Sequence, residues 1–326
     1  MSSVNSTGSS HAPTFFLLGI PGMEKEQFWI AFPFCIMYVI AVLGNIILLI
    51  VIKTESSLHE PMYLFLAMLA FTDLSSLYIP CCPKWLAIFW GFWEIGFIFL
   101  LFLSTSFSTV ESGCAHGHGL DRYFAICHPL RHFQLPLHAG GGSSGSLVLL
   151  RAVLMVSPLC FLLRRKDFCH HRVISHSYCE HMAVVKLVCE DTRVNAAYGL
   201  FAAFAVTGFD LMGITLSYTM ILRVVLKLSA SNTQLKALNT CVSHVCVILT
   251  FYVSGLFTFL AHRIGHNIPQ QIHILVANLY LLLPSVLNPI IYGLRTRQLR
   301  DKIVVFFQQR GIGFVSVSQM VLIIYW

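Results

Sequence analysis

Eight polar or charged residues stand inside long apolar stretches of the chain, where a lipid bilayer would offer them no water. A charged side chain at membrane depth costs a few kcal/mol or more, so each of these residues raises a functional question. Carboxylate and amide oxygens there can bind a hard cation, and an acid beside an arginine can form an ion pair that opens and closes. The eight are Asn45, Asp73, Glu111, Asp121, Arg122, Arg151, Asp210 and Asn288.

Seven stretches are long and apolar enough to carry these residues across a membrane, because a spanning helix needs roughly 20 mostly apolar residues. Charged segments and turn residues separate the stretches. The sequence therefore predicts an all-α membrane protein, a bundle of seven transmembrane helices followed by a short amphipathic eighth helix. The expected spans are 28–52, 61–80, 95–126, 146–163, 197–226, 237–261 and 271–292.

Composition supports this class. Hydrophobic residues make up 56% of the chain and charged residues 11%, against about 25% charged in a soluble protein. The formal charge of +7 is common in membrane proteins that face anionic lipid, and it does not indicate a nucleic-acid partner.

We expect three segments: an extracellular N-terminal tail at 1–27, the transmembrane domain at 28–292, and a cytoplasmic amphipathic helix and tail at 293–326. The polar residues 1–14 do not form a signal peptide, so insertion is expected to begin at the first span. Asn5 begins an Asn-Ser-Thr glycosylation sequon. Basic residues favour an internal C-terminus by only 11 to 9.

The segment after the seventh span is amphipathic. Leu299, Ile303 and Phe306 fall on one helical face, and basic residues surround them. This pattern favours a helix lying on the inner leaflet, although an ordinary basic stop-transfer tail would look similar.

Three of the 11 cysteines, Cys169, Cys179 and Cys189, lie between the fourth and fifth spans. That loop is expected on the oxidising side of the membrane, where disulfides form. Spacing alone does not assign their pairing. Metal binding with the nearby histidines is the rival interpretation, but no tight C-x-x-C or H-x-x-x-H pair supports it.

Four motifs together identify a family. They are Gly44-Asn45 in the first span, PMYLFLA at 61–67 followed by Asp73, DRYFAICHPL at 121–130, and NPIIY at 288–292. Over residues 15–309 the chain resembles the rhodopsin-like G-protein-coupled receptors and, within them, the odorant receptors. GIPG at 19–22, SHSYC at 175–179 and HRIG at 262–265 are similar to its class I (fish-like) branch.

The resemblance implies a receptor that binds a small odorant from outside and activates a stimulatory heterotrimeric G protein to raise cAMP. It implies the plasma membrane of sensory-neuron cilia, an external N-terminus, no catalytic residues and no cofactor. A retinal-linked pump would need a lysine in the seventh span, which has none. A hydrolase would need a nucleophile elbow or an H-E-x-x-H site. The Gly-Ser cluster at 140–145 is expected to be a loop, and the sequence has no H-E-x-x-H site.

The resemblance also assigns roles to the polar residues. A cluster of Asp73, Glu111, Asn45 and Asn288 would hold a sodium ion, since a hard cation takes several oxygen ligands; a hydrogen-bonded packing cluster without an ion is the alternative. Arg122 would pair with Asp121 at rest and then move to other partners on activation. The full set of switch residues is Asp121, Arg122, Tyr123, Tyr218, Asn288, Pro289 and Tyr292.

For the ligand, class I receptors imply small, water-soluble acids. Arg263, at the outer end of the sixth span, matches an arginine that clamps a carboxylate in relatives, and a guanidinium suits that task. The alternative for Arg263 is a side chain that extends to the membrane interface. The other expected ligand residues are His181, Thr105, Ser108, Phe209, Tyr252 and Thr258.

Four departures from the family pattern leave a second interpretation open, a decayed and poorly folding relic of a receptor. The third span lacks the cysteine that pairs with Cys179 in relatives, leaving Cys169–Cys189 as the available loop bridge. Residues 113–120 contain three glycines, each costing about 1 kcal/mol in a helix. The sixth span has no proline, and the Gly/Ser run at 139–145 is expected to be a loop that shortens the fourth span.

Overall fold

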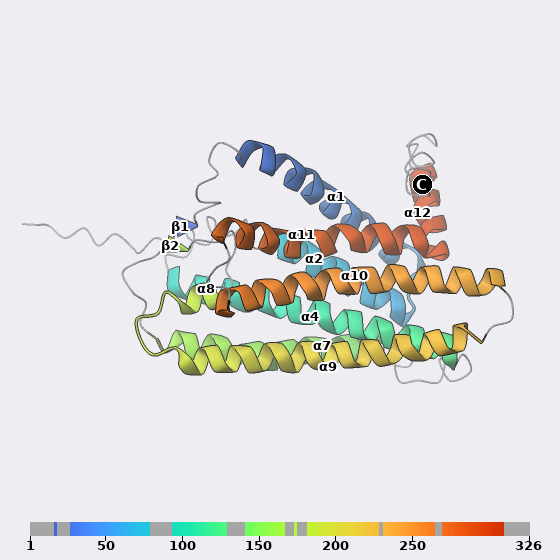
Figure 1. The fold of residues 1–326 in the computed structure, drawn as a ribbon. Helices are drawn as coiled ribbons and strands as arrows, with labels where there is room; N and C mark the ends of the chain where they lie inside the picture. The colour runs from blue at the N-terminus through green and yellow to red at the C-terminus, as the bar shows by residue number, and fades with distance from the viewer. Residues whose placement is uncertain are drawn as a thin grey trace, which may run out of the picture.

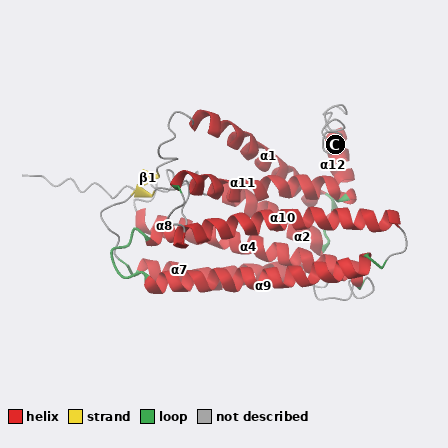
Figure 2. Ribbon diagram, in the orientation of Figure 1, coloured by secondary structure: helices red, strands yellow, loops and turns green. Residues whose placement is uncertain are grey.

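The computed structural model describes residues 16–17, 27–78, 93–128, 141–166, 173–174, 181–227, 231–264 and 269–309. Seven long helices run side by side through this part of the chain (Figure 1), and Figure 2 shows how little of it is not helical. They are α1 (Gln27–Thr54), α2 (Pro61–Tyr78), α4 (Trp93–Cys127), α7 (Gly141–Arg164), α9 (Arg193–Val225), α10 (Ser231–Ile264) and α11 (Gln270–Arg295).

The remaining described elements are short. They are η1 (Ser56–Leu58), α8 (His181–Val185), α12 (Arg297–Gln309), and the strands β1 (Phe16–Leu17) and β2 (Val173–Ile174). The two strands pair in parallel, with Phe16 opposite Val173 and Leu17 opposite Ile174. The strands and α8 lie at one end of the bundle and α12 at the other (Figure 1), so we call these the α8 end and the α12 end.

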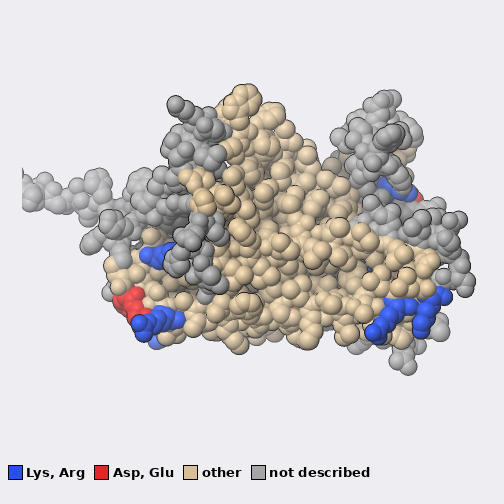
Figure 3. Space-filling view, in the orientation of Figure 1, with Lys and Arg blue, Asp and Glu red and all other residues tan. Residues whose placement is uncertain are grey.

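Six of the seven long helices are long and apolar enough to cross a membrane, and the apolar part of the seventh, Met62–Tyr78, is shorter. Large apolar side chains such as Leu154 and Phe201 point outward along the helices. Charged side chains gather at the two ends of the visible face, with an uncharged band between them (Figure 3). The predicted all-α bundle of seven transmembrane helices is confirmed.

α4 is the central helix and packs against α2, α7 and α9, while α10 pairs with α11 and α1 packs on α2 and α11. α12 is anchored where α1 and α2 meet, because Leu299 is fully buried in the core cluster there. The Tyr63 hydroxyl donates to Gln298 Oε1 at 2.6 Å, and Lys302 pairs with Glu55. α12 is therefore fixed to the bundle along one side.

The glycines of α4 allow close helix packing. A Cβ on Gly113 would lie 2.8 Å from Val148 of α7, and one on Gly117 would lie 2.7 Å from the ring of Phe65 in α2. A larger residue at either position would force the neighbouring side chain to move. The intrinsic cost of these glycines is therefore offset, at least in part, by contacts that only a residue without a side chain permits.

The expectation of a short fourth span was wrong. α7 begins at Gly141 and is 24 residues long, so most of the Gly/Ser run is helical. Gly145 packs so closely on Met68 that a Cβ there would lie 2.8 Å from its sulfur. Tertiary packing overrides weak helix propensity at this point. α10 begins at Ser231, six residues before the predicted start at 237, and runs unbroken to Ile264.

Candidate functional site

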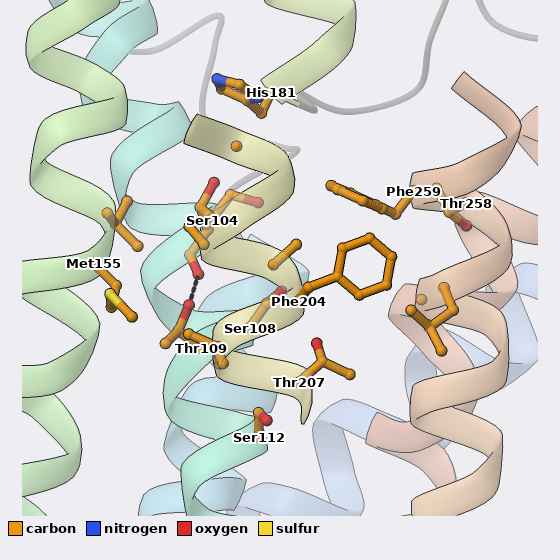
Figure 4. A pocket seen from close by; sticks show the side chains of 18 of the residues that line it. Ser104, Ser108, Thr109, Ser112, Met155, His181, Phe204, Thr207, Thr258 and Phe259 are labelled. Atoms are coloured by element: carbon orange, nitrogen blue, oxygen red, sulfur yellow. Dashed lines mark hydrogen bonds between the residues drawn. The ribbon is translucent and has the colours of Figure 1, made fainter. Parts of the chain in front are cut away.

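A cavity of about 220 Å³ lies in the half of the bundle toward the α8 end. Side chains of α4, α7, α9, α10 and α11 form its wall, and His181 of α8 lies over it (Figure 4). Its volume and mixed wall fit a small molecule. Seven of its lining residues carry a Ser or Thr hydroxyl, namely Ser104, Thr105, Ser108, Thr109, Ser112, Thr207 and Thr258.

The rest of the described wall is largely apolar or aromatic. Phe204 and Phe259 face each other edge to face across α9 and α10, with ring centroids 6.3 Å apart. Tyr280 of α11 donates from its hydroxyl to Ser108 at 3.2 Å. Among the described lining residues there is no lysine, arginine, aspartate or glutamate, and His181 is the one histidine.

Five residues expected to contact a ligand line this cavity, brought together from α4, α8 and α10: Thr105, Ser108, His181, Tyr252 and Thr258. Their binding of a ligand stays a prediction. The structure adds Ser104, a lining residue that could have been found because Ser104, Ser108 and Ser112 are spaced by four and share a helix face.

Phe209 lies elsewhere. Its side chain is 57% exposed and its ring lies 5.3 Å from that of His116, outside the described lining. Two residues correspond to about 200° around a helix. Since Thr207 faces the cavity, Phe209 faces away from it.

The side chain of Arg263 is outside the described side chains, but its place on α10 is described. It follows Phe259, which lines the cavity, by four residues, so the two positions share a helix face. Arg263 therefore stands one turn nearer the α8 end than the cavity wall.

An ion pair between a partly exposed arginine and a fully buried aspartate lies next to the cavity, and we call the cluster around it the floor. Arg151 of α7 donates two hydrogen bonds to Asp210 of α9, from Nη1 to Oδ1 at 2.6 Å and from Nη2 to Oδ2 at 2.8 Å. The Asp210 carboxylate also accepts from Ser112 and lies 3.0 Å from His116 Nδ1. Ser112 in turn lies 2.8 Å from the hydroxyl of Tyr252, so the floor connects α4, α7, α9 and α10. Both charges were noted in the sequence, but nothing there paired them.

At the α12 end, Asp121 and Arg122 do not form the ion pair expected at rest, since no such contact is found among the described residues. Successive residues on a helix do not face each other, which explains the difference. Arg122 lies close enough to Tyr218 and Tyr292 for its charge to act on both hydroxyls.

Within the described contacts, Tyr218 Oη and Arg122 Nε make no hydrogen bond. Tyr123 lies on the outer side, 3.2 Å from His128 Nε2.

An aromatic stack joins three helices one turn above Arg122. The imidazoles of His118 (α4) and His244 (α10) are nearly parallel, with centroids 5.0 Å apart. Tyr292 of α11 meets both edge-on at 5.1 Å. Pro289 of α11 lies beside Gly44, where a Cβ would come within 2.8 Å of the proline ring. Tyr292, one of the residues expected to switch on activation, is thus in contact with α4 and α10.

Asp73 of α2 meets polar residues of α11, and its grouping with Asn45 and Glu111 around an ion stays a prediction. Asn288 Nδ2 donates to Asp73 at 2.9 Å and Ser285 Oγ donates at 3.2 Å, while Asn45 donates to the Ser285 carbonyl at 2.9 Å. Glu111 lies within electrostatic reach of Asp73.

The Asp73 cluster fits a hard cation. The Oδ1 atoms of Asn45 and Asn288 are buried and accept no hydrogen bond within the described residues. Two amide oxygens and two carboxylates would suit a sodium ion. No group of three or more His, Cys, Asp or Glu side chains arranged for a metal is found in the described ranges, so the asparagine oxygens would complete the ligand set.

Other predicted positions are only partly described. Cys189 is disulfide-bonded, whereas Cys169, Cys179 and the sequon at Asn5 lie outside the described residues. The pairing of Cys169 with Cys189 therefore stays a prediction.

The bundle has seven helices of membrane length or nearly so. It holds a small-molecule cavity toward one end and a polar contact network toward the other. These features define a seven-helix membrane receptor. A sequence model described as olfactory receptor matches residues 34–310. Human olfactory receptor 52R1 is 53% identical over 300 residues, covering 91% of this chain and 95% of the relative. Human olfactory receptor 52A5 is 51% identical over 315 residues, covering 92% and 97%.

The chain therefore belongs to the olfactory receptor family, and its similarity to family 52 receptors confirms the predicted class I branch. It is a multi-pass membrane protein and a G-protein-coupled receptor for odorants, and not an enzyme.

Proposed function

We propose that this receptor binds small carboxylate-bearing odorants from outside the cell and activates a stimulatory heterotrimeric G protein, which raises cAMP. In this proposal the N-terminus and the α8 end are outside, the α12 end is in the cytoplasm, and the receptor works in sensory-neuron cilia. The observation that carries the proposal is the place of Arg263, one helical turn beyond the cavity-lining Phe259.

The chemistry of such a site is simple. A guanidinium matches a carboxylate with two charge-assisted hydrogen bonds, and the described cavity wall offers no competing acid. His181 of α8 lies over the same end of the cavity and can add a hydrogen bond. The acid group would then lie at the mouth and the carbon chain would point toward Ser112 and Tyr252.

Signal transfer would use α10, which contributes to both ends of the receptor. Tyr252 lines the cavity and holds α10 to α4 through Ser112, and His244 of the same helix stacks on His118 near Arg122. A ligand that binds one position of α10 more tightly than another shifts the population between them. Arg122, Tyr218 and Tyr292 would change partners as α10 moves.

We also propose that the Asp73 cluster binds sodium in the resting receptor. The two buried amide oxygens without hydrogen-bond donors, on Asn45 and Asn288, support this part of the proposal. When bound, the ion would balance one of the two negative charges that Asp73 and Glu111 can carry, while Asn288 and Ser285 keep the Asp73 carboxylate oriented.

A cAMP reporter in cells exposed to straight-chain short fatty acids tests the ligand class. We expect Arg263→Ala to weaken any acid response at least about tenfold, because a charge-assisted hydrogen bond contributes about 1.5–3 kcal/mol. Arg263→Lys keeps the charge without the planar fork and should lose part of the response. Arg193→Ala removes an exposed arginine at the same end of the bundle and is the matched control. An unchanged dose–response for Arg263→Ala would remove this residue from the site.

Staining of intact cells through an N-terminal tag tests both the orientation and the relic interpretation. A surface signal supports a folded receptor with its N-terminus outside. No signal, even with export chaperones present, favours the relic. The close packing at Gly113 and Gly117 supports the folded receptor.

A further inference from the structure

Three hydroxyls in the cavity wall differ from the other helical hydroxyls nearby. A helical Ser or Thr usually bonds to the backbone carbonyl four residues earlier, as Thr109 does to Thr105 at 2.9 Å and Thr258 to Ser254 at 3.0 Å. Within the described contacts the hydroxyls of Ser104, Thr105 and Thr207 make no hydrogen bond. These three groups are available to whatever fills the cavity.

The three hydroxyls lie at two depths. Ser104 lies on the His181 side of the cavity and Thr105 follows it in α4, whereas Thr207 of α9 lies deeper, at a level between Ser108 and Ser112 (Figure 4). The neighbours of Thr207 in the wall include the apolar Phe204 and Val206. A plain hydrocarbon chain that reached this depth would displace water from the Thr207 hydroxyl without replacing its hydrogen bond.

We infer that the preferred ligands carry a second hydrogen-bonding group along their chain, so that they are short hydroxy or oxo acids and not simple fatty acids. This inference rests on the proposed function, since it places the acid group at the mouth. A threonine hydroxyl both donates and accepts, so either a hydroxyl or a ketone oxygen satisfies Thr207. The hydroxyls of Ser104 and Thr105, which lie nearer the α8 end, would contact the part of the ligand next to its carboxylate.

Selectivity follows from the same geometry. A site that hydrogen-bonds a ligand hydroxyl disfavours the analogue that lacks it, because a polar group of the site is left without a partner. One neutral hydrogen bond corresponds to a difference of about three- to tenfold in potency.

The test compares each straight-chain acid with its hydroxy analogues of the same length, with the hydroxyl moved along the chain. A matched series of alcohols and the corresponding diols is measured in the same reporter cells. The readout is the potency ratio of the oxygenated compound to its parent, because this ratio does not depend on expression level. We expect one hydroxyl position to improve potency about three- to tenfold.

Thr207→Val should reduce that ratio to about one, and Thr207→Ser should restore it, since serine keeps the hydroxyl. Thr219→Val is the matched control, because Thr219 lies on the same helix, is exposed and bonds to the Thr215 carbonyl. The control should keep the full ratio.

Each outcome of this test supports or contradicts the inference, the acid-binding function, or both. A hydroxyl gain among acids that Thr207→Val removes supports both the inference and the acid-binding function. The same gain in the diol series alone supports the inference and contradicts the acid class. Equal potency of parent and oxygenated compounds in whichever series responds overturns the inference, and so does a gain that survives Thr207→Val. A surface-expressed receptor that answers neither series contradicts both.

Discussion

Two carboxylates, Asp210 and Asp73, are buried in the same bundle and are balanced in different ways. Asp210 is fully buried and meets a bidentate arginine, a histidine and a serine. Asp73 is 1% exposed, and among the described residues its hydrogen bonds come from Asn288 and Ser285, which carry no charge. Glu111, which lies within electrostatic reach of Asp73, has the same sign of charge.

This difference separates a structural cluster from an exchangeable one. The protein supplies the cation for Asp210, so that cluster can hold four helices together without help. Asp73 has neutral donors and a nearby acid, so its charge needs a cation or a proton from outside the chain. A group whose balancing charge can leave is suited to a conformational change, whereas a group paired within the protein is suited to support.

The largest expected effect comes from breaking the Asp210 cluster. Asp210→Asn leaves the Arg151 guanidinium, whose side chain is 25% exposed, without its opposite charge, which costs up to about 3–5 kcal/mol. We expect loss of surface staining and a clearly lower thermal unfolding temperature in detergent. The exposed Asp301, which pairs with Arg300 on α12, provides the control Asp301→Asn, which should behave like the parent.

A double variant separates charge from packing in this cluster. Replacing both Asp210 and Arg151 by leucine removes the two charges together and should restore much of the lost stability, because an apolar pair of similar size is often as stable as a buried ion pair. If Asp210→Asn unfolded at the parent's temperature, the distinction between the two carboxylates would be lost.

Asp73 should respond to sodium in a way that Asp210 does not. We expect sodium chloride to stabilise the solubilised receptor relative to N-methylglucamine chloride, by about 1.4 kcal/mol at about ten times the dissociation constant. Asp73→Asn should abolish this difference, while Glu55→Gln, which removes the acid of the α12 ion pair, should keep it. A parent receptor that is equally stable in both salts would argue for a packing cluster without an ion.

The smallest effect tests the neutral donors. Ser112→Ala and Ser285→Ala each remove one hydroxyl bond to a buried carboxylate, which contributes about 0.5–1.5 kcal/mol. Asp210 keeps three other donor bonds after Ser112→Ala, whereas Asp73 keeps one after Ser285→Ala. In the absence of sodium, the thermal unfolding temperature should therefore fall more for Ser285→Ala than for Ser112→Ala. An equal fall in unfolding temperature for the two variants would mean that the number of remaining donors does not affect stability.

The sequence predicted what depends on local pattern. Apolar runs located all seven long helices, and short motifs located Arg122 and Tyr292 toward the α12 end, with Asn288 one helical turn before Tyr292. Thr105 and Ser108 were expected among the ligand residues, and both line the cavity. These features follow from composition over one or two helical turns.

What failed depends on contacts between distant segments. No local pattern around Arg151 or Asp210 predicts their contact, because the two residues are 59 positions apart in the sequence. α9 is apolar on most sides, so its inward face is not visible in the sequence, and Phe209 was placed on the wrong side. The start of α7 was missed because packing of Gly145 on Met68, and not the propensity of its glycines, decides where the helix forms.

Gly213 leaves room for the contact between His116 and Asp210. The His116 imidazole occupies the space where a Cβ on Gly213 would stand, only 2.4 Å from Nε2. Any larger residue at 213 would push the ring off Asp210. Gly213 and His116 are therefore a linked pair: a larger residue at 213 requires a different side chain, or a new position for the ring, at 116.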